Sequence, residues 1–255
     1  MLCLLAAVAA SAPSPTPHPH NGLLKKYEFK SPRRYGCSLR GISDEELRKG
    51  KPVVRRLPGK LGSRGRLMSV QDVHAPEKVV WNTINDVTRY PEMCDGVIST
   101  DVYAQRPTKT GGKLVKAQYK IRLAPAVSVG YYVTHVFEPL KHCMTFHLDY
   151  AHKSQFSDMA GYWYVEQLPG ADKWSRVYFS SDAIVPSWLA WARDGLSKQA
   201  AYKNLYWVEA YSEKAMGRGG PIKHGHIVRN VAIGGAAVAV GARCWRRGRA
   251  AASPA

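Results

Sequence analysis

Residues 186–217 read PSWLAWARDGLSKQAAYKNLYWVEAYSEKAMG, and this stretch predicts one long helix. Pro186 and Ser187 form a start signal, Gly217 forms a stop signal, and no proline lies between them. The stretch is apolar along one side at helical spacing, and it has a second, aromatic side. The aromatic side consists of Trp188, Trp191, Tyr202 and Tyr206. A helix that is apolar on more than one side is usually buried, so we expect it to pack against the rest of the chain.

The residues before this helix predict a series of antiparallel strands. Residues 113–123 are the clearest, because Val115, Ala117 and Tyr119 alternate with polar or charged residues. Further strands are predicted at 66–74, 97–105, 127–137, 142–150, 160–168 and 174–185. A helix is predicted from Pro76 to Tyr90, since Pro91 disfavours helical backbone before it. The order predicts an α+β fold in which a curved antiparallel sheet wraps around the long C-terminal helix.

The positive charge of the chain is concentrated at its two ends. The 255 residues carry a net charge of +18. The first 66 residues hold 14 Lys and Arg against four Asp and Glu, residues 67–217 hold 16 against 15, and residues 218–255 hold seven against none. Basic tails on a neutral domain favour targeting signals or anionic lipid headgroups over nucleic acid. We expect a leader and basic disordered segment in 1–64, a ligand-binding domain in 65–217, and a basic tail in 218–255.

Both tails carry an apolar stretch. Residues 1–12 resemble the apolar part of a signal sequence and end in Ala10-Ser11-Ala12, which is typical of a cleavage site. We expect a two-part organelle leader, with a plastid favoured and a mitochondrion or the secretory route as alternatives; a plain disordered N-terminus also fits. Residues 231–242 are apolar but shorter than a membrane-spanning helix. They fit either a membrane-associated segment beside basic residues or a disordered tail.

The sequence predicts no cofactor and no metal site. The five cysteines are scattered and odd in number, which does not suit a disulfide framework. The nine histidines show no zinc-ligand spacing. The motifs G-x-G-x-x-G, the P-loop and G-x-S-x-G do not occur, which removes the usual sequence signals for dinucleotide, nucleotide or serine-hydrolase chemistry.

Three short motifs carry a family resemblance. They are Asp86-Val87-Thr88-Arg89-Tyr90-Pro91-Glu92 at the end of the first helix, Gly161-Tyr162-Trp163 in a late strand, and Pro186 before the last helix. With them, residues 65–216 resemble the START-like (SRPBCC) superfamily, nearest its polyketide cyclase/dehydrase and coenzyme Q-binding branch. The resemblance implies a helix-grip fold with a hydrophobic cavity between the sheet and the long helix. The motifs are structural rather than catalytic, so they predict the fold better than the function.

If that cavity exists, inward-facing apolar residues should line it. The candidates are Tyr119, Ile121, Phe146, Leu148, Trp163, Phe179, Trp191, Tyr202 and Tyr206. Aromatic residues with a polar tip suit a ligand with an apolar body and few polar groups, although core packing uses the same residue types. We expect the chain to bind and transport a lipid, isoprenoid or quinone. The alternatives are a polyketide cyclase/aromatase-like enzyme with the same cavity, and an interaction scaffold.

The titratable residues do not identify a catalytic site, and none is assigned. His147 and Asp149 are two residues apart on one strand and are expected to face outward. Glu166 and Asp182 lie on two other predicted strands. An inward-facing polar group, such as His135 beside Tyr119, would favour the enzyme, because general acid–base chemistry needs a titratable group inside a cleft.

Overall fold

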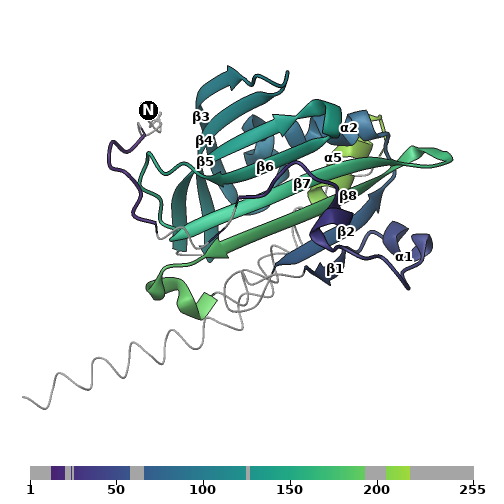
Figure 1. Ribbon diagram of the computed structural model, residues 1–255, viewed down its shortest axis with the longest axis horizontal. Coiled ribbons are helices and arrows are strands. Elements are labelled where there is room, and N and C mark those ends of the chain that lie inside the picture. Colours follow the sequence, from purple (N-terminus) through teal and green to yellow (C-terminus); the bar gives the residue numbers. More distant parts are fainter. Residues whose placement is uncertain are drawn as a thin grey trace, which may run out of the picture. The chain divides into compact units, whose positions relative to one another are not determined.

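The centre of the fold is one antiparallel sheet of eight strands in the order β1-β2-β8-β7-β6-β5-β4-β3 (Figure 1). The structure, a computed structural model, describes residues 13–20, 24, 26–57, 66–124, 127–192 and 205–218. The strands are β1 (Val53–Arg56), β2 (Leu67–Val73), β3 (Val97–Pro107), β4 (Lys113–Ala124), β5 (Val127–Glu138), β6 (Cys143–Leu148), β7 (Asp158–Leu168) and β8 (Ala171–Ile184). The seven predicted strands are confirmed as β2 to β8, and the α+β class with them.

The first helix ends earlier than the sequence predicted. α2 (Glu77–Asn85) buries Val80, Trp81 and Ile84, as its periodicity indicated. A 3₁₀ turn at Val87–Arg89 follows, and then a second short helix, α3 (Tyr90–Met93). Pro91 lies in the first turn of α3, where its missing N–H removes no hydrogen bond. The proline therefore begins a new helical turn instead of ending the previous helix.

The predicted C-terminal helix is described only at its two ends. A 3₁₀ helix, η4 (Ser187–Ala192), occupies the expected start, and α5 (Tyr206–Ala215) occupies the end. Residues 193–204 lie outside the described residues, so the single long helix stays a prediction. The predicted stop is confirmed, because α5 is followed by Gly217 with a φ of 68°. α5 contacts α2, α3 and β2, and we call this side of the sheet the inner face.

The opposite side of the sheet, the outer face, is covered by the N-terminal segment, residues 24 and 26–57 (Figure 1). The segment contributes Leu24, Tyr27, Cys37, Leu47 and Leu57 to a buried cluster, and the sheet contributes Met68, Val70, Cys143, Ala160, Tyr162 and Tyr178. β1 also extends the sheet by pairing with β2. The described part of this segment is therefore folded, which corrects the expectation of disorder up to residue 64. Its apolar residues are too irregularly spaced to give a periodic signal, and the sheet supplies the surface that they need.

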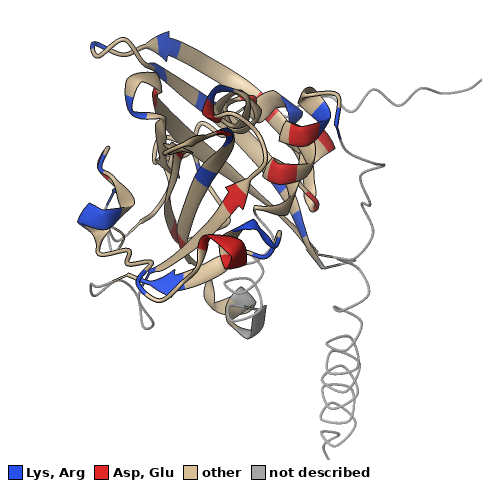
Figure 2. Cartoon of the chain, turned by 90° about the vertical axis from the view of Figure 1, so that its right-hand side faces the viewer, with Lys and Arg blue, Asp and Glu red and all other residues tan. Residues whose placement is uncertain are grey.

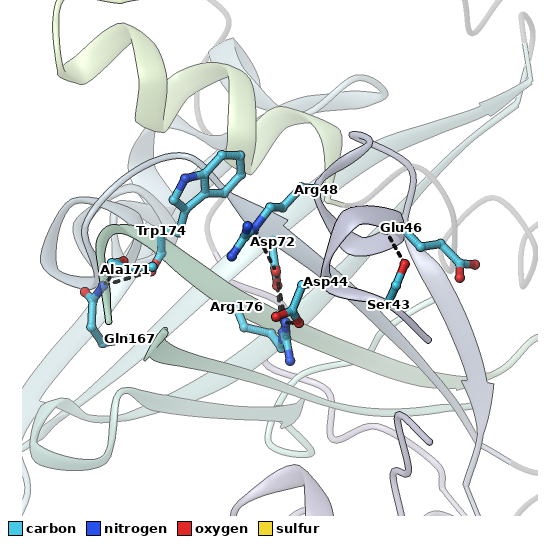
Figure 3. A network of polar contacts seen from close by, with 9 residues as sticks. All are labelled: Ser43, Asp44, Glu46, Arg48, Asp72, Gln167, Ala171, Trp174 and Arg176. Carbon is cyan, nitrogen blue, oxygen red and sulfur yellow. Dashed lines mark hydrogen bonds and ion pairs between the residues drawn. The ribbon is translucent and has the colours of Figure 1, made fainter. Parts of the chain in front are cut away.

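A polar network fastens α1 (Asp44–Arg48) of the N-terminal segment to two strands (Figure 3). Arg176 of β8 donates to both carboxylate oxygens of Asp72 of β2, at 2.6 and 2.9 Å, and to Asp44 at 2.8 Å. Arg48 lies over the ring of Trp174. Asp72 is fully buried, so the two hydrogen bonds from Arg176 replace the water that its carboxylate loses.

Charge is mixed over the central elements. Lys and Arg are interspersed with Asp and Glu over the described helices and strands (Figure 2), as the near-neutral composition of residues 67–217 predicted.

Candidate functional site

The inner face is lined mainly by aromatic and aliphatic side chains. The rings of Trp163 of β7 and Trp207 of α5 lie 5.8 Å apart between centroids, and Trp207 lies 5.2 Å from Tyr90 of α3. Tyr119 stacks on Tyr131 across β4 and β5 at 5.4 Å. These contacts place aromatic rings from three strands and two helices on one side of the sheet. Such a surface can bury the apolar body of a ligand as well as a helix.

Six of the nine predicted lining residues lie on the inner face, as their alternation indicated. They are Tyr119, Ile121, Phe146, Leu148, Trp163 and Phe179. All are buried except Ile121, which is half-buried. Strand alternation was sufficient to find them because the side-chain period of a strand is two.

The three predicted residues from the C-terminal helix are not brought to the inner face by the described structure. Tyr202 and the side chain of Trp191 lie outside the described residues. Tyr206 is 44% exposed at the first residue of α5, which contradicts its predicted burial. The next residue, Trp207, is buried and contacts Trp163 and Tyr90. One residue turns a helix by about 100°, so the error is a misjudged phase between two aromatic sides.

The ring of Phe146 can lie over the neighbouring strand β7 only because Gly161, its partner there, has no side chain. An ideal Cβ on Gly161 would lie 1.8 Å from Cζ of the Phe146 ring. The Phe146 ring therefore lies over the Gly161 backbone, with the Phe179 ring 6.4 Å away. Each residue of the Gly161-Tyr162-Trp163 motif therefore makes a different contact. Gly161 leaves room for the Phe146 ring, Tyr162 packs under the N-terminal segment, and Trp163 contacts α5.

A pair of polar side chains lies among these rings. The hydroxyl of Tyr119 and Nε2 of His135 are 2.8 Å apart, on the adjacent strands β4 and β5. Both residues are buried, with 3% and 4% of their surfaces exposed. His135 also lies near Phe137 and Phe146, with centroids 6.0 and 5.9 Å away. From the sequence, His135 beside Tyr119 was an arrangement that would favour an enzyme, and the structure places the two side chains together on the inner face.

Both members of the Tyr119–His135 pair are neutral at ordinary pH. Burial, with smaller contributions from His147 and from the positive charge of Lys113, lowers the pKa of His135 to about 3. Burial raises the pKa of Tyr119 well above its usual value, with the neighbouring Tyr90 and Tyr131 acting in the same direction. The inner face therefore offers hydrogen-bonding groups here without a charge.

The other titratable candidates lie on the outer face or along its edge. His147 lies opposite Thr134 and Ala160, facing outward as predicted, and burial lowers its pKa to about 4. Asp149 accepts hydrogen bonds from Tyr103 at 2.5 Å and Lys116 at 3.0 Å. These bonds outweigh the opposing effect of burial and lower the pKa of Asp149. Each residue has its own surroundings, and no hydrogen bond between them occurs in the described structure.

Glu166 and Asp182 also have structural partners. Glu166 accepts a hydrogen bond from the hydroxyl of Tyr178 at 2.7 Å. Asp182 lies 2.7 Å from the guanidinium of Arg66 and also accepts from Tyr27 of the N-terminal segment. The arginine lies over the Tyr27 ring, 4.0 Å from its centroid. Asp182 therefore holds the N-terminal segment on the sheet, whereas Glu166 links β7 to β8, and both carboxylates lie on the outer face.

A cleft of about 560 Å³ lies between α2 and the last turns of α5. Its lining includes Thr83, Arg89, Tyr211 and Lys214 and none of the nine predicted residues. The described residues contain no cluster of His, Cys, Asp or Glu suited to a metal ion. Within the same residues, every helix is too short or too polar to cross a bilayer.

The fold matches those of solved structures. The aromatase/cyclase Zhui from Streptomyces sp. R1128 matches 68% of this chain and 100% of its own, with 10% identity and a TM-score of 0.50. A STAR-related lipid transfer protein from Xanthomonas axonopodis matches 62% of this chain and 92% of its own, with 14% identity and a TM-score of 0.46. A START superfamily protein from Mycobacterium smegmatis matches 59% of this chain and 98% of its own, with 13% identity and a TM-score of 0.43. No family model and no curated protein matches the sequence.

The chain therefore has a START-like fold, as its motifs indicated. Zhui, whose fold this chain shares, is an aromatase/cyclase. The fold is compatible with a hydrophobic ligand, but it does not distinguish carriage of that ligand from its conversion.

Proposed function

We propose that the chain binds and carries a hydrophobic small molecule between the inner face and the C-terminal helical segment. The observation that supports this proposal most is the set of buried aromatic rings around the neutral pair Tyr119–His135. A lipid, isoprenoid or similar molecule fits such a surface, because burial of apolar area provides the affinity and a few polar groups set the orientation.

Native mass spectrometry of the full chain, purified from a lipid-containing host, tests this function. We expect a stoichiometric hydrophobic molecule to be carried by the protein and to be identified after extraction. Ala117→Trp should abolish its uptake, because Ala117 is fully buried on the inner face and a tryptophan would occupy the space of the ligand. Ala104→Trp is the matched control, since Ala104 is exposed on β3. Equal uptake by both variants would place the ligand elsewhere or refute the function.

A polyketide cyclase/aromatase-like activity at the same face is the second candidate. The buried hydrogen bond between Tyr119 and His135 favours it, because a phenol and an imidazole in contact can relay a proton to a bound substrate. An enzyme would convert an added poly-β-ketone, and Tyr119→Phe would slow that conversion while binding persists. A carrier would release the same compound unchanged.

We also propose that the basic ends direct the chain to an organelle, with a plastid favoured, and to anionic membrane surfaces. Cleavage after Ala12 would leave the packed N-terminal segment intact, whereas cleavage near residue 64 would remove β1 and the cover of the outer face. We therefore place the removable signal in residues 1–12. A fluorescent protein fused to residues 1–20 should enter the organelle if this is right, and should remain cytosolic if it is wrong.

A further inference from the structure

One nitrogen of the buried His135 has no partner among the described residues. Nε2 faces the hydroxyl of Tyr119, but Nδ1 is buried without a hydrogen bond. The surroundings of the ring are apolar, since Phe137 and Phe146 flank it. A buried polar atom in such surroundings costs free energy until it finds a partner, so this nitrogen is a candidate for a contact with a ligand.

The contact with Tyr119 determines which nitrogen carries the proton. A neutral imidazole has one N–H donor and one bare acceptor nitrogen. Among the described residues, the hydroxyl of Tyr119 has no hydrogen-bond acceptor other than Nε2, so it donates to Nε2. The proton of the imidazole is then on Nδ1, and the free atom is a hydrogen-bond donor. Tyr119 is a positioning residue here, because it acts on the ligand through His135.

The charge of the surroundings limits the chemistry of the partner. The ammonium of Lys113 lies over the Phe137 ring, 4.6 Å from its centroid, so a cationic ligand would be repelled. A buried carboxylate would lose its hydration, and although Lys113 would attract it, the neutral pair offers it no charged partner. A carbonyl oxygen accepts a hydrogen bond and carries no charge, so its burial here costs the least free energy.

We propose that Nδ1–H of His135, held in this tautomer by Tyr119, donates a hydrogen bond to an uncharged carbonyl oxygen of the ligand. The site then prefers ketone-type molecules to hydrocarbons of the same shape. This inference rests on the proposed function, because it assigns the polar end of the same inner-face site.

Three small probes test the assignment: 2-acetylnaphthalene, 2-ethylnaphthalene and 2-naphthoate. They share the naphthalene ring and differ in the attached group, which is a ketone, a hydrocarbon or a carboxylate. Calorimetry with the full chain should show about tenfold tighter binding of the ketone than of the hydrocarbon, the size of one hydrogen bond to a buried donor. His135→Phe should reduce this ratio to about one while the hydrocarbon still binds. His147→Phe makes the same change on the outer face and should leave the ratio at tenfold.

The outcomes separate the inference from the function. Equal binding of ketone and hydrocarbon, a ratio that survives His135→Phe, or tightest binding of 2-naphthoate would overturn the carbonyl assignment and leave the binding function standing. Failure of all three probes to bind would count against both. A long-range ¹H–¹⁵N spectrum of the wild-type histidines is independent of any variant: it should show His135 protonated at Nδ1, and protonation at Nε2 would refute the donor.

Discussion

Replacement of Gly161 by alanine tests whether the packing of the inner face depends on one missing side chain. Phe146 lies opposite Gly161 in the pairing of β6 and β7. The new methyl group would fall 1.8 Å from Cζ of the Phe146 ring, whereas carbon atoms in contact prefer about 3.5 Å, so the ring must move by roughly 1.7 Å. Its neighbours, His135 and Phe179, restrict that movement.

The expected cost follows from the cost of overpacking a core. Inserted methyl groups that force side chains from their rotamers destabilise proteins by about 1–3 kcal/mol. We expect about 2 kcal/mol for Gly161→Ala, because the clash is with a ring that other rings surround. For a chain of this size, this corresponds to a fall in Tm of about 4–8 °C. The double variant Gly161→Ala/Phe146→Leu should lose less than the sum of its two single changes, since the smaller leucine leaves room for the methyl group.

Urea unfolding followed by tryptophan fluorescence measures these differences. Gly130→Ala is the matched control, because a Cβ there would meet Gln155 and the Tyr119 carbonyl at 3.7 and 3.8 Å, which is ordinary contact. The control should be neutral or slightly stabilised, as expected when alanine replaces a strand glycine that has space. The reasoning fails if Gly161→Ala loses less than about 0.5 kcal/mol, or if the two alanine variants behave alike.

Three further predictions concern the Arg176–Asp72 ion pair, the N-terminal segment and the buried His135. Arg176→Gln should lower the free energy of unfolding by about 3–5 kcal/mol, because it leaves Asp72 buried without its main partner, whereas Asp44→Asn, at an exposed carboxylate, should cost about 0–1 kcal/mol. Equal costs in urea unfolding would refute this account. Leu47→Ala should cost about 2–5 kcal/mol if the segment is folded on the sheet, and near zero in the same assay if it is disordered. His135 has a folded-state pKa of about 3, below its unfolded value near 6.5. Between these values only the unfolded chain binds the proton, so stability present above pH 6.5 is lost as pH falls, by up to about 1.4 kcal/mol per pH unit. The difference between the unfolding midpoints at pH 7 and pH 4.5 should shrink in His135→Phe, with His147, whose pKa is also lowered, responsible for part of what remains. An unchanged pH difference in that variant would contradict the shift.

The N-terminal segment on the outer face shows where prediction from the sequence stopped. Tyr27, Leu47 and Leu57 are single apolar residues in a basic segment, and composition indicated disorder there. Their burial depends on Met68, Tyr162 and other outer-face residues that are distant in the sequence. Only the folded sheet brings those residues together, so no local pattern in the segment could reveal the contact.

The sequence by itself determined the order of seven strands, the first helix and the inward alternation of Tyr119, Phe146 and Trp163, because these follow from local periodicity. It also supplied the motifs of the START-like fold. The tertiary structure decided the rest: that Trp207 and not Tyr206 meets Trp163, that Gly161 makes room for Phe146, and that Tyr119 holds His135. These are contacts between distant segments, and their geometry depends on strand register and helix phase, which a single sequence does not specify.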